Sequence, residues 1–154
     1  MWLRSRGWHI LPVYEKEINN GKGPRLFFPN DTQFVAPDIL AFRSDSTLWI
    51  EAKTKSVFSW HRKTGKWVTG IDLHHYNQYQ RVANASPWPV WLLFLHKFER
   101  EATRTEPWPC PTGLYGGLLG NLINCENHRH QNWGRSGMVY WAESSLKKIS
   151  EYPL

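Results

Sequence analysis

Asp38, Glu51 and Lys53, within residues 37–53, are two carboxylates and an amine of the kinds that act together on metal ions and phosphates. Asp38 lies in a short apolar run that ends at Arg43, and a second apolar run carries Glu51 and Lys53. Both runs are rich in strand-forming residues, and the four residues between them, 44–47, are typical of a turn. The sequence therefore predicts a β-hairpin that brings Asp38 beside Glu51 and Lys53.

Alternation along the second strand separates its side chains into two sets, because successive residues of a strand point to opposite faces. Leu48, Ile50 and Ala52 form an apolar set that we expect to pack on the core. Glu51 and Lys53 share the other face. Burying such charges costs several kcal/mol unless they are paired or bind a metal. Two carboxylates beside one amine suit a hard divalent cation and a phosphate oxygen.

The pattern Pro37-Asp38 followed by Glu51-Ala52-Lys53 resembles the signature of the PD-(D/E)XK nuclease superfamily, which has a restriction-endonuclease-like fold. The resemblance implies Mg²⁺, with Mn²⁺ as a substitute, held by Asp38, Glu51 and the backbone carbonyl of Ala52. It also implies that Lys53 orients the attacking water and neutralises the scissile phosphate. The alternative interpretation is a surface hairpin with an ordinary Glu–Lys pair.

A third acidic ligand is less well defined. Members of the superfamily often contribute an acid from a helix before the first strand. Here the basic residues 1–7 have room only for the last turn of a helix, ended by Gly7, and none of them is acidic. Glu15, at the end of a predicted edge strand over residues 8–14, is the available substitute as a catalytic residue and metal ligand. A solvated charge at a strand end explains Glu15 equally well.

The chain of 154 residues predicts a single domain over residues 1–154. It has no apolar segment long enough to span a membrane and no apolar leader segment, so we expect a cytoplasmic protein of a prokaryote, phage or plasmid. A net charge of +6 favours a polyanionic partner. Cys110, Cys125, His128 and His130 match no zinc-finger spacing, and only two cysteines suit a reducing compartment.

The segment after Lys53 is basic and aromatic, and it contains no acidic residue before Asp72. Residues 63–65 predict the tip of a second, projecting hairpin. Such a hairpin could contact phosphates with its cations and stack its Trp side chains on bases. In the alternative, the two Trp side chains pack on each other across the strands, and both interpretations can hold together. The candidate nucleic-acid-binding residues are Lys55, Trp60, Arg62, Lys63, Lys66 and Trp67.

A helix is predicted over residues 73–85, with Asp72 as its N-cap. It resembles the helix with which many nucleases of the superfamily line their site. That resemblance offers Gln78 as a catalytic residue, and Tyr79 and His75 as weaker candidates. Core packing is the alternative for Tyr79.

The apolar run over residues 90–95 predicts a strand buried on both faces, parallel to the Glu51 strand. The strand–helix–strand order predicts an α/β fold with an α/β/α core and a mixed central sheet. Elsewhere, residues 25–28 are expected to pair beside the Asp38 strand. We also expect helices over residues 113–124 and 144–149 and a strand over residues 138–141.

These patterns predict a Mg²⁺-dependent nuclease that cuts DNA by its structure, like a Holliday junction resolvase or a phage or plasmid nuclease. The residues do not distinguish DNA from RNA. One site cuts one strand, so cleavage of a duplex or junction would require a homodimer. The alternative from another class is a non-catalytic nucleic-acid-binding module on the same fold. That module would not need Asp38, Glu51 and Lys53 together.

Overall fold

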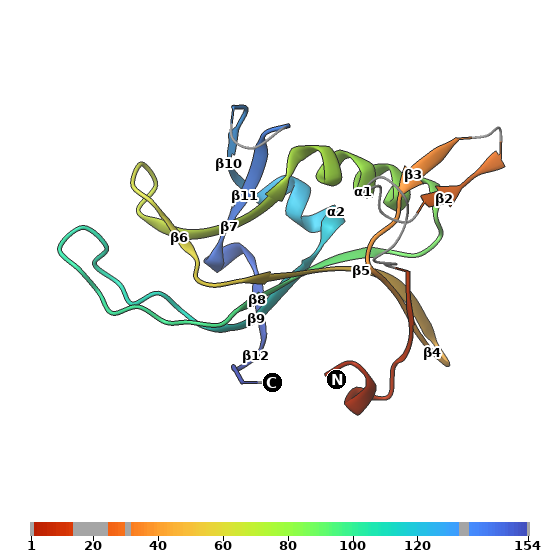
Figure 1. The fold of residues 1–154 in the computed structure, drawn as a ribbon, viewed down its shortest axis with the longest axis horizontal. Helices are drawn as coiled ribbons and strands as arrows, with labels where there is room; N and C mark the ends of the chain where they lie inside the picture. Colours follow the sequence, from red (N-terminus) through yellow and green to blue (C-terminus); the bar gives the residue numbers. More distant parts are fainter. Residues whose placement is uncertain (1, 14–24, 30–31, 133–135, 154) are drawn as a thin grey trace.

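The computed structural model describes residues 2–13, 25–29, 32–132 and 136–153. A six-stranded mixed sheet organises them (Figure 1). Neighbouring strands in it are antiparallel, except β5 and β8, which are parallel. The strands, in their order across the sheet, are β1 (His9–Pro12), β4 (Ile39–Arg43), β5 (Ser46–Lys55), β8 (Val90–His96), β9 (Gly113–Leu118) and β12 (Lys147–Ser150).

A second sheet of four strands and two helices pack on one face of the large sheet, called the front face here (Figure 1). The second sheet consists, in spatial order, of β10 (Glu126–His130), β11 (Met138–Ala142), β7 (Lys66–Asp72) and β6 (Ser59–His61). The helices are α1 (Leu73–Ala85) and the short α2 (Leu119–Leu122). The 3-10 turns given for the described residues are η1 (Arg4–Arg6), η3 (Ile123–Cys125) and η4 (Glu143–Ser145). No described helix is long and apolar enough to cross a membrane.

The predicted α/β fold, its mixed sheet and its projecting hairpin are confirmed. Helix α1 begins at Leu73, directly after β7, with Asp72 as its N-cap. The Asp72 carboxylate accepts hydrogen bonds from the backbone N–H of His74 at 2.9 Å and from the Ser136 hydroxyl at 2.5 Å. Burial acts to raise the pKa of Asp72, but these hydrogen bonds outweigh burial and lower it. The cap therefore favours the ionised carboxylate.

The main core lies on the face of β5 that carries Glu51, so the prediction that the Leu48 face packs on the core holds only for Ile50. Trp49 is buried there with Leu92 and Phe94 of β8, under α1 and the second sheet. The cause is the chain order, because β7 leads directly into α1 and sets that helix on the front face. Ile50 on the opposite, back face is also buried, but Ala52 is exposed.

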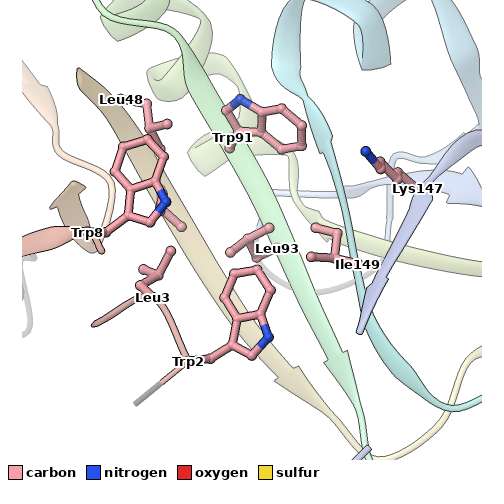
Figure 2. Close-up of a pocket in the computed structure, with 9 residues that line it drawn as sticks. Trp2, Leu3, Trp8, Leu48, Trp91, Leu93, Lys147 and Ile149 are labelled. Atoms are coloured by element: carbon pink, nitrogen blue, oxygen red, sulfur yellow. The ribbon is translucent and has the colours of Figure 1, made fainter. Parts of the chain in front are cut away.

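The back face has a thinner cover. Residues 2–8, with the 3-10 turn η1 ended by Gly7 at a φ of 76°, cross it. Figure 2 shows the apolar hollow that results, of about 230 Å³. It is lined by Trp2, Leu3, Trp8, Leu48, Ile50, Trp91, Leu93, Lys147 and Ile149.

Two predicted helices were wrong. Residues 113–118 form strand β9, and only Leu119–Leu122 is helical. The glycines cause the difference, since a Cβ on Gly116 would come within 2.8 Å of the Leu92 carbonyl oxygen on β8. Glycine thus lets β9 pass close to β8. Residues 143–150 form η4 and then strand β12, which satisfies the free backbone edge of β9.

The strand over Arg25–Phe27, β2, does not pair beside the Asp38 strand as predicted. It pairs with β3 (Gln33–Val35) in a small separate sheet. Strand β4 already has β1 on one side and β5 on the other, so neither of its edges is available. The predicted four-residue turn after β4 is also shorter than expected. Arg43 pairs with Ser46, which leaves a two-residue turn.

Candidate active site

Asp38 lies between β3 and β4, and both its backbone and its side chain accept hydrogen bonds from other strands or segments. Its carbonyl oxygen accepts a hydrogen bond from the Val13 backbone N–H at 2.9 Å. Its carboxylate oxygen Oδ2 accepts one from the backbone N–H of Ala52 at 3.1 Å. Ala52 directly follows Glu51 on β5, so this bond fixes the Asp38 carboxylate beside the second acidic residue.

Glu51 occupies the middle of β5, between β4 and β8, and is only 1% exposed. Its Oε1 forms an ion pair with Nζ of Lys53, two residues along the same strand face. The Tyr79 hydroxyl approaches it from α1. Even so, neither carboxylate oxygen of Glu51 receives a hydrogen bond of normal geometry from the described residues. A buried carboxylate in this condition is under-compensated.

The titration of Glu51 follows from this environment. Burial raises its pKa above the usual value, the charge of Lys53 opposes that effect, and the nearby Asp38 carboxylate adds to it. Burial also raises the pKa of Tyr79, and the Glu51 charge raises it further. Tyr79 therefore stays a neutral hydroxyl. A further positive charge at the site would favour the ionised form of Glu51.

A divalent metal ion fits these residues. Mg²⁺ and Mn²⁺ prefer oxygen ligands, and here two carboxylates lie together, with the buried Glu51 carboxylate ion-paired to Lys53 but without a hydrogen bond of normal geometry from the described residues. Asp38, Glu51 and the Ala52 carbonyl are the oxygen donors that the sequence predicted. Among the described residues there is no cluster of three or more His, Cys, Asp or Glu side chains suited to a metal. Glu15, the predicted third acid, lies outside the described residues.

Comparison with known proteins gives a likeness in structure. The sequence matches no protein-family model, and no curated protein matches it significantly. The chain is similar to Hjc, a Holliday junction resolvase from the archaeal hyperthermophile Archaeoglobus fulgidus, with a TM-score of 0.51 and 12% identity. The similarity covers 94% of this chain and 82% of that one. The protein has the restriction-endonuclease-like fold.

A nuclease from a fusselovirus is also similar, with a TM-score of 0.44 and 15% identity, over 96% of this chain and 76% of that one. In the restriction-endonuclease-like fold of this chain, Asp38, Glu51 and Lys53 come from the central β4–β5 hairpin. The hairpin predicted from the sequence is thus the element that positions all three side chains.

Helix α1 closes the front of the site with three residues at helical spacing, His75, Gln78 and Tyr79, which share one helix face. Tyr79 is both buried in the core and set against Glu51, so core packing and a place in the site are compatible. Burial lowers the pKa of His75, and the charge of Lys53 lowers it further. The charge of Lys53 thus acts on His75, and Lys53 is the residue predicted to neutralise the scissile phosphate.

Gln78 has a specific partner. Its side-chain oxygen Oε1 accepts a hydrogen bond from the backbone N–H of Val35 at 3.1 Å. Val35 ends β3, three residues before Asp38. This contact ties the segment that carries Asp38 to helix α1, which suits a positioning residue.

We expect Gln78→Ala to lower any cleavage rate by about tenfold, because a small displacement of a reacting group can cost up to 100-fold. Gln78→Glu, which keeps an acceptor oxygen for the Val35 N–H, should restore much of the rate. The measurement is kcat and KM for both variants on one DNA substrate, and the loss should appear in kcat. Equal activity of parent and Gln78→Ala would contradict a positioning role.

Two features of the predicted hairpin are present together. Trp60 and Trp67 face each other across β6 and β7, with ring centroids 5.1 Å apart in an edge-to-face arrangement. Arg62, Lys63 and Lys66 are exposed around the tip. The Trp pair therefore holds the hairpin together and leaves its cations in solvent.

Lys55 belongs to the site more than to the hairpin tip. It follows Lys53 on the same face of β5 and is half-buried. Burial lowers its pKa, and the charge of Lys53 lowers it further. Glu51, Lys53 and Lys55 thus form a row along one strand face, with the acid at one end and two amines after it.

The cysteines and histidines of the C-terminal half lie apart. Cys110 is buried and Cys125 is exposed. The ring of His128 stacks between His61, at 3.8 Å, and Tyr140, at 4.6 Å. These rings pack on one another on the second sheet.

Proposed function

We propose that the protein is a divalent-metal-dependent nuclease that hydrolyses phosphodiester bonds of DNA and selects its substrate by DNA structure. The observation that carries the proposal is the buried Glu51 carboxylate, short of hydrogen bonds and adjacent to Asp38 and Lys53. A non-catalytic module would have no use for such an arrangement, since two acids repel phosphates. The similarity of the fold to that of a Holliday junction resolvase supports the same class of activity.

The residues have separate roles in this proposal. Asp38, Glu51 and the Ala52 carbonyl would hold Mg²⁺ or Mn²⁺, with Glu15 as a further ligand. When bound, the ion would supply Lewis-acid stabilisation of the phosphate and lower the pKa of the attacking water.

The remaining residues act on the substrate. Lys53 would orient the water and place its positive charge at the scissile phosphate. Lys55 and the hairpin cations Arg62, Lys63 and Lys66 would bind phosphates outside the site of cleavage.

The proposed substrate is branched DNA such as a four-way junction, or phage or plasmid DNA that is being processed. The basic, aromatic hairpin beside the site suits contact with DNA backbones and unstacked bases more than a reading of sequence. Cutting both strands would require two sites, and a homodimer would supply them.

Lys53→Ala should abolish metal-dependent cleavage. The assay compares linear duplex, single-stranded and four-way-junction DNA, with Mg²⁺, Mn²⁺ or EDTA. We expect the parent to cut only with a metal and Lys53→Ala to lose at least about 100-fold in rate, since a charge at the reacting phosphate acts mainly in the transition state. Lys147→Ala, on the back face, is the matched control and should cut normally.

Two outcomes would decide between the proposal and its alternative. A parent that cuts none of these substrates, yet binds DNA equally well with Ca²⁺ and with EDTA, would overturn the nuclease in favour of a binding module. Binding that improves with Ca²⁺ and is followed by cleavage with Mg²⁺ would support the nuclease.

A further inference from the structure

Two segments project from the same side of the molecule and run beside each other (Figure 1). The first arm, residues 59–68, is the β6–β7 hairpin. The second arm, residues 97–112, connects β8 to β9 and is closed by a bridge between Arg100 and Cys110. The indole N–H of Trp67 donates a hydrogen bond to the Trp108 carbonyl oxygen at 3.2 Å. The Arg100 guanidinium lies 5.3 Å from the centre of the Trp67 ring.

A hollow of about 290 Å³ opens between the two arms. Trp60, Trp67 and Trp108 make it strongly aromatic, and Glu143 brings a carboxylate to it. The full lining is Trp60, Gly65, Lys66, Trp67, Trp108, Pro109, Pro111, Glu143 and Ser144. We call this hollow the arm slot.

Trp108 is the unusual member of the arm slot, because 64% of it is exposed to solvent. Leaving a large indole in water forgoes the favourable burial that the side chain offers. Prolines precede and follow it at positions 107, 109 and 111 and restrict the backbone. Because the prolines restrict the backbone that carries Trp108, a contact made by its exposed ring would cost little conformational entropy.

The chemistry of the arm slot fits a nucleobase. Flat aromatic side chains stack on bases of any sequence. The half-buried Glu143 can accept a hydrogen bond from the exocyclic amino group that adenine and cytosine carry. The same carboxylate disfavours a phosphate beside it, while Lys66, the one cation among the described residues of the lining, can pair with a phosphate that flanks the inserted base.

The charges on the two arms, outside the arm slot, suit the phosphates of a DNA strand. The first arm carries three exposed cations, Arg62, Lys63 and Lys66, and no acidic residue. The second arm is balanced, with Lys97, Arg100 and Arg104 against Glu99, Glu101 and Glu106. The phosphates that flank an inserted base would therefore lie along the first arm.

We propose that the arm slot binds a nucleobase unstacked from a DNA strand, so that the protein prefers DNA with an unpaired nucleotide. This inference rests on the proposed function and names the substrate feature that the protein selects. It assigns the second arm, and Trp108 in particular, to substrate recognition. Base-paired DNA cannot supply such a base without the cost of unpairing and unstacking it.

The test measures binding in EDTA to two labelled duplexes that differ by one unpaired 2-aminopurine. We expect the parent to bind the bulged duplex about tenfold more tightly, in line with the stacking of one base on an aromatic side chain. The fluorescence of the 2-aminopurine should fall on binding. Trp108→Ala should remove both effects, and Trp108→Phe should restore part of them. Trp88→Ala, a partly exposed Trp outside both arms, is the control and should behave like the parent.

Each result has one meaning. Equal affinity of the parent for the two duplexes, or an unchanged fluorescence response in Trp108→Ala, would overturn the arm slot while DNA cleavage by the parent kept the proposed function in place. Failure of the parent to bind or cut any DNA would overturn both. Because Trp108 is largely exposed, circular dichroism should show that Trp108→Ala folds normally.

Discussion

Glu51→Gln should abolish cleavage and, at the same time, raise the melting temperature of the metal-free protein. Activity should fall by more than about 100-fold, the loss found when only a residue supporting a metal ligand is changed. The gain in stability follows from burial. A carboxyl group whose pKa is raised on folding gives stability below its ordinary pKa and loses it as the pH rises through the raised value. Once the pH exceeds the raised pKa, the folded protein therefore bears the cost of an ionised, buried Glu51.

The expected gain for Glu51→Gln in EDTA is on the order of 1–3 kcal/mol, because a neutral amide replaces an under-compensated charge. For a chain of this size, each kcal/mol corresponds to about 2–4 °C in melting temperature. Mg²⁺ or Mn²⁺ should stabilise the parent and leave the variant unchanged, because in the proposed function the Glu51 carboxylate is a ligand of the ion and the variant lacks it. Differential scanning calorimetry with and without the metal measures both effects.

Glu126→Gln is the matched control, and here we expect the melting temperature to change in the opposite direction. Hydrogen bonds from Arg129 lower the pKa of Glu126, and the Tyr76 hydroxyl donates to the same carboxylate at 2.5 Å. Its ionised form is therefore stabilising, and the amide should lower the melting temperature. A Glu51→Gln protein that melts below the parent in EDTA would contradict the account of Glu51 as an uncompensated charge.

Acid should begin to destabilise the protein as the pH falls below the ordinary histidine pKa of about 6.5, because of His96. This residue ends β8, is fully buried and stacks on Phe58 with ring centroids 3.5 Å apart. Burial lowers its pKa to about 4, against a smaller opposing effect of the Val57 backbone. The neutral ring is thus favoured in the fold. Stability is complete above the ordinary histidine pKa of about 6.5 and is lost as the pH falls towards 4.

The free energy of unfolding should drop by about 3 kcal/mol between pH 7 and pH 4 through His96 alone, since a tenfold change in proton affinity is worth about 1.4 kcal/mol. Urea denaturation of the parent and of His96→Phe across this range gives the measurement. The Phe variant keeps the ring and cannot be protonated, so its pH dependence should be flatter by about that amount.

His75 and His128 also have pKa values lowered by burial and contribute in the same pH range. The difference between parent and variant isolates His96 from them. Parallel pH profiles for the two proteins would contradict the prediction.

The parts of the fold that could be predicted from the sequence are those determined by residues close together in the chain. The β4–β5 hairpin, the buried strand β8 and helix α1 each have a clear periodicity, and Asp72 marks the start of α1. The parts that did not follow depend on distant residues. Nothing local in residues 113–118 reports that Gly116 must pass within contact of β8, and strand β12 forms because β9 has a free edge.

The candidate site likewise has residues that the local sequence predicts and residues that depend on distant contacts. Asp38, Glu51 and Lys53 could be predicted because strand alternation and one hairpin bring them together. The bond from Gln78 to Val35 joins residues 43 positions apart, and no periodic signal marks it. Trp108 was not predicted as a binding residue for a related reason. Its segment is irregular and rich in proline, and the hydrogen bond that sets it beside Trp67 joins residues far apart in the sequence.

The two-residue turn between β4 and β5 sets a limit on how the length of this chain can vary. Arg43 pairs directly with Ser46, so one added residue at the turn would shift β5 by one position unless it formed a bulge. Such a shift would carry Glu51 to the back face. The tip of the first arm is open, since a Cβ added at Gly65 would meet nothing within 4 Å. Insertions and deletions should therefore be tolerated better at the tip of the first arm than at Ser44 and Asp45.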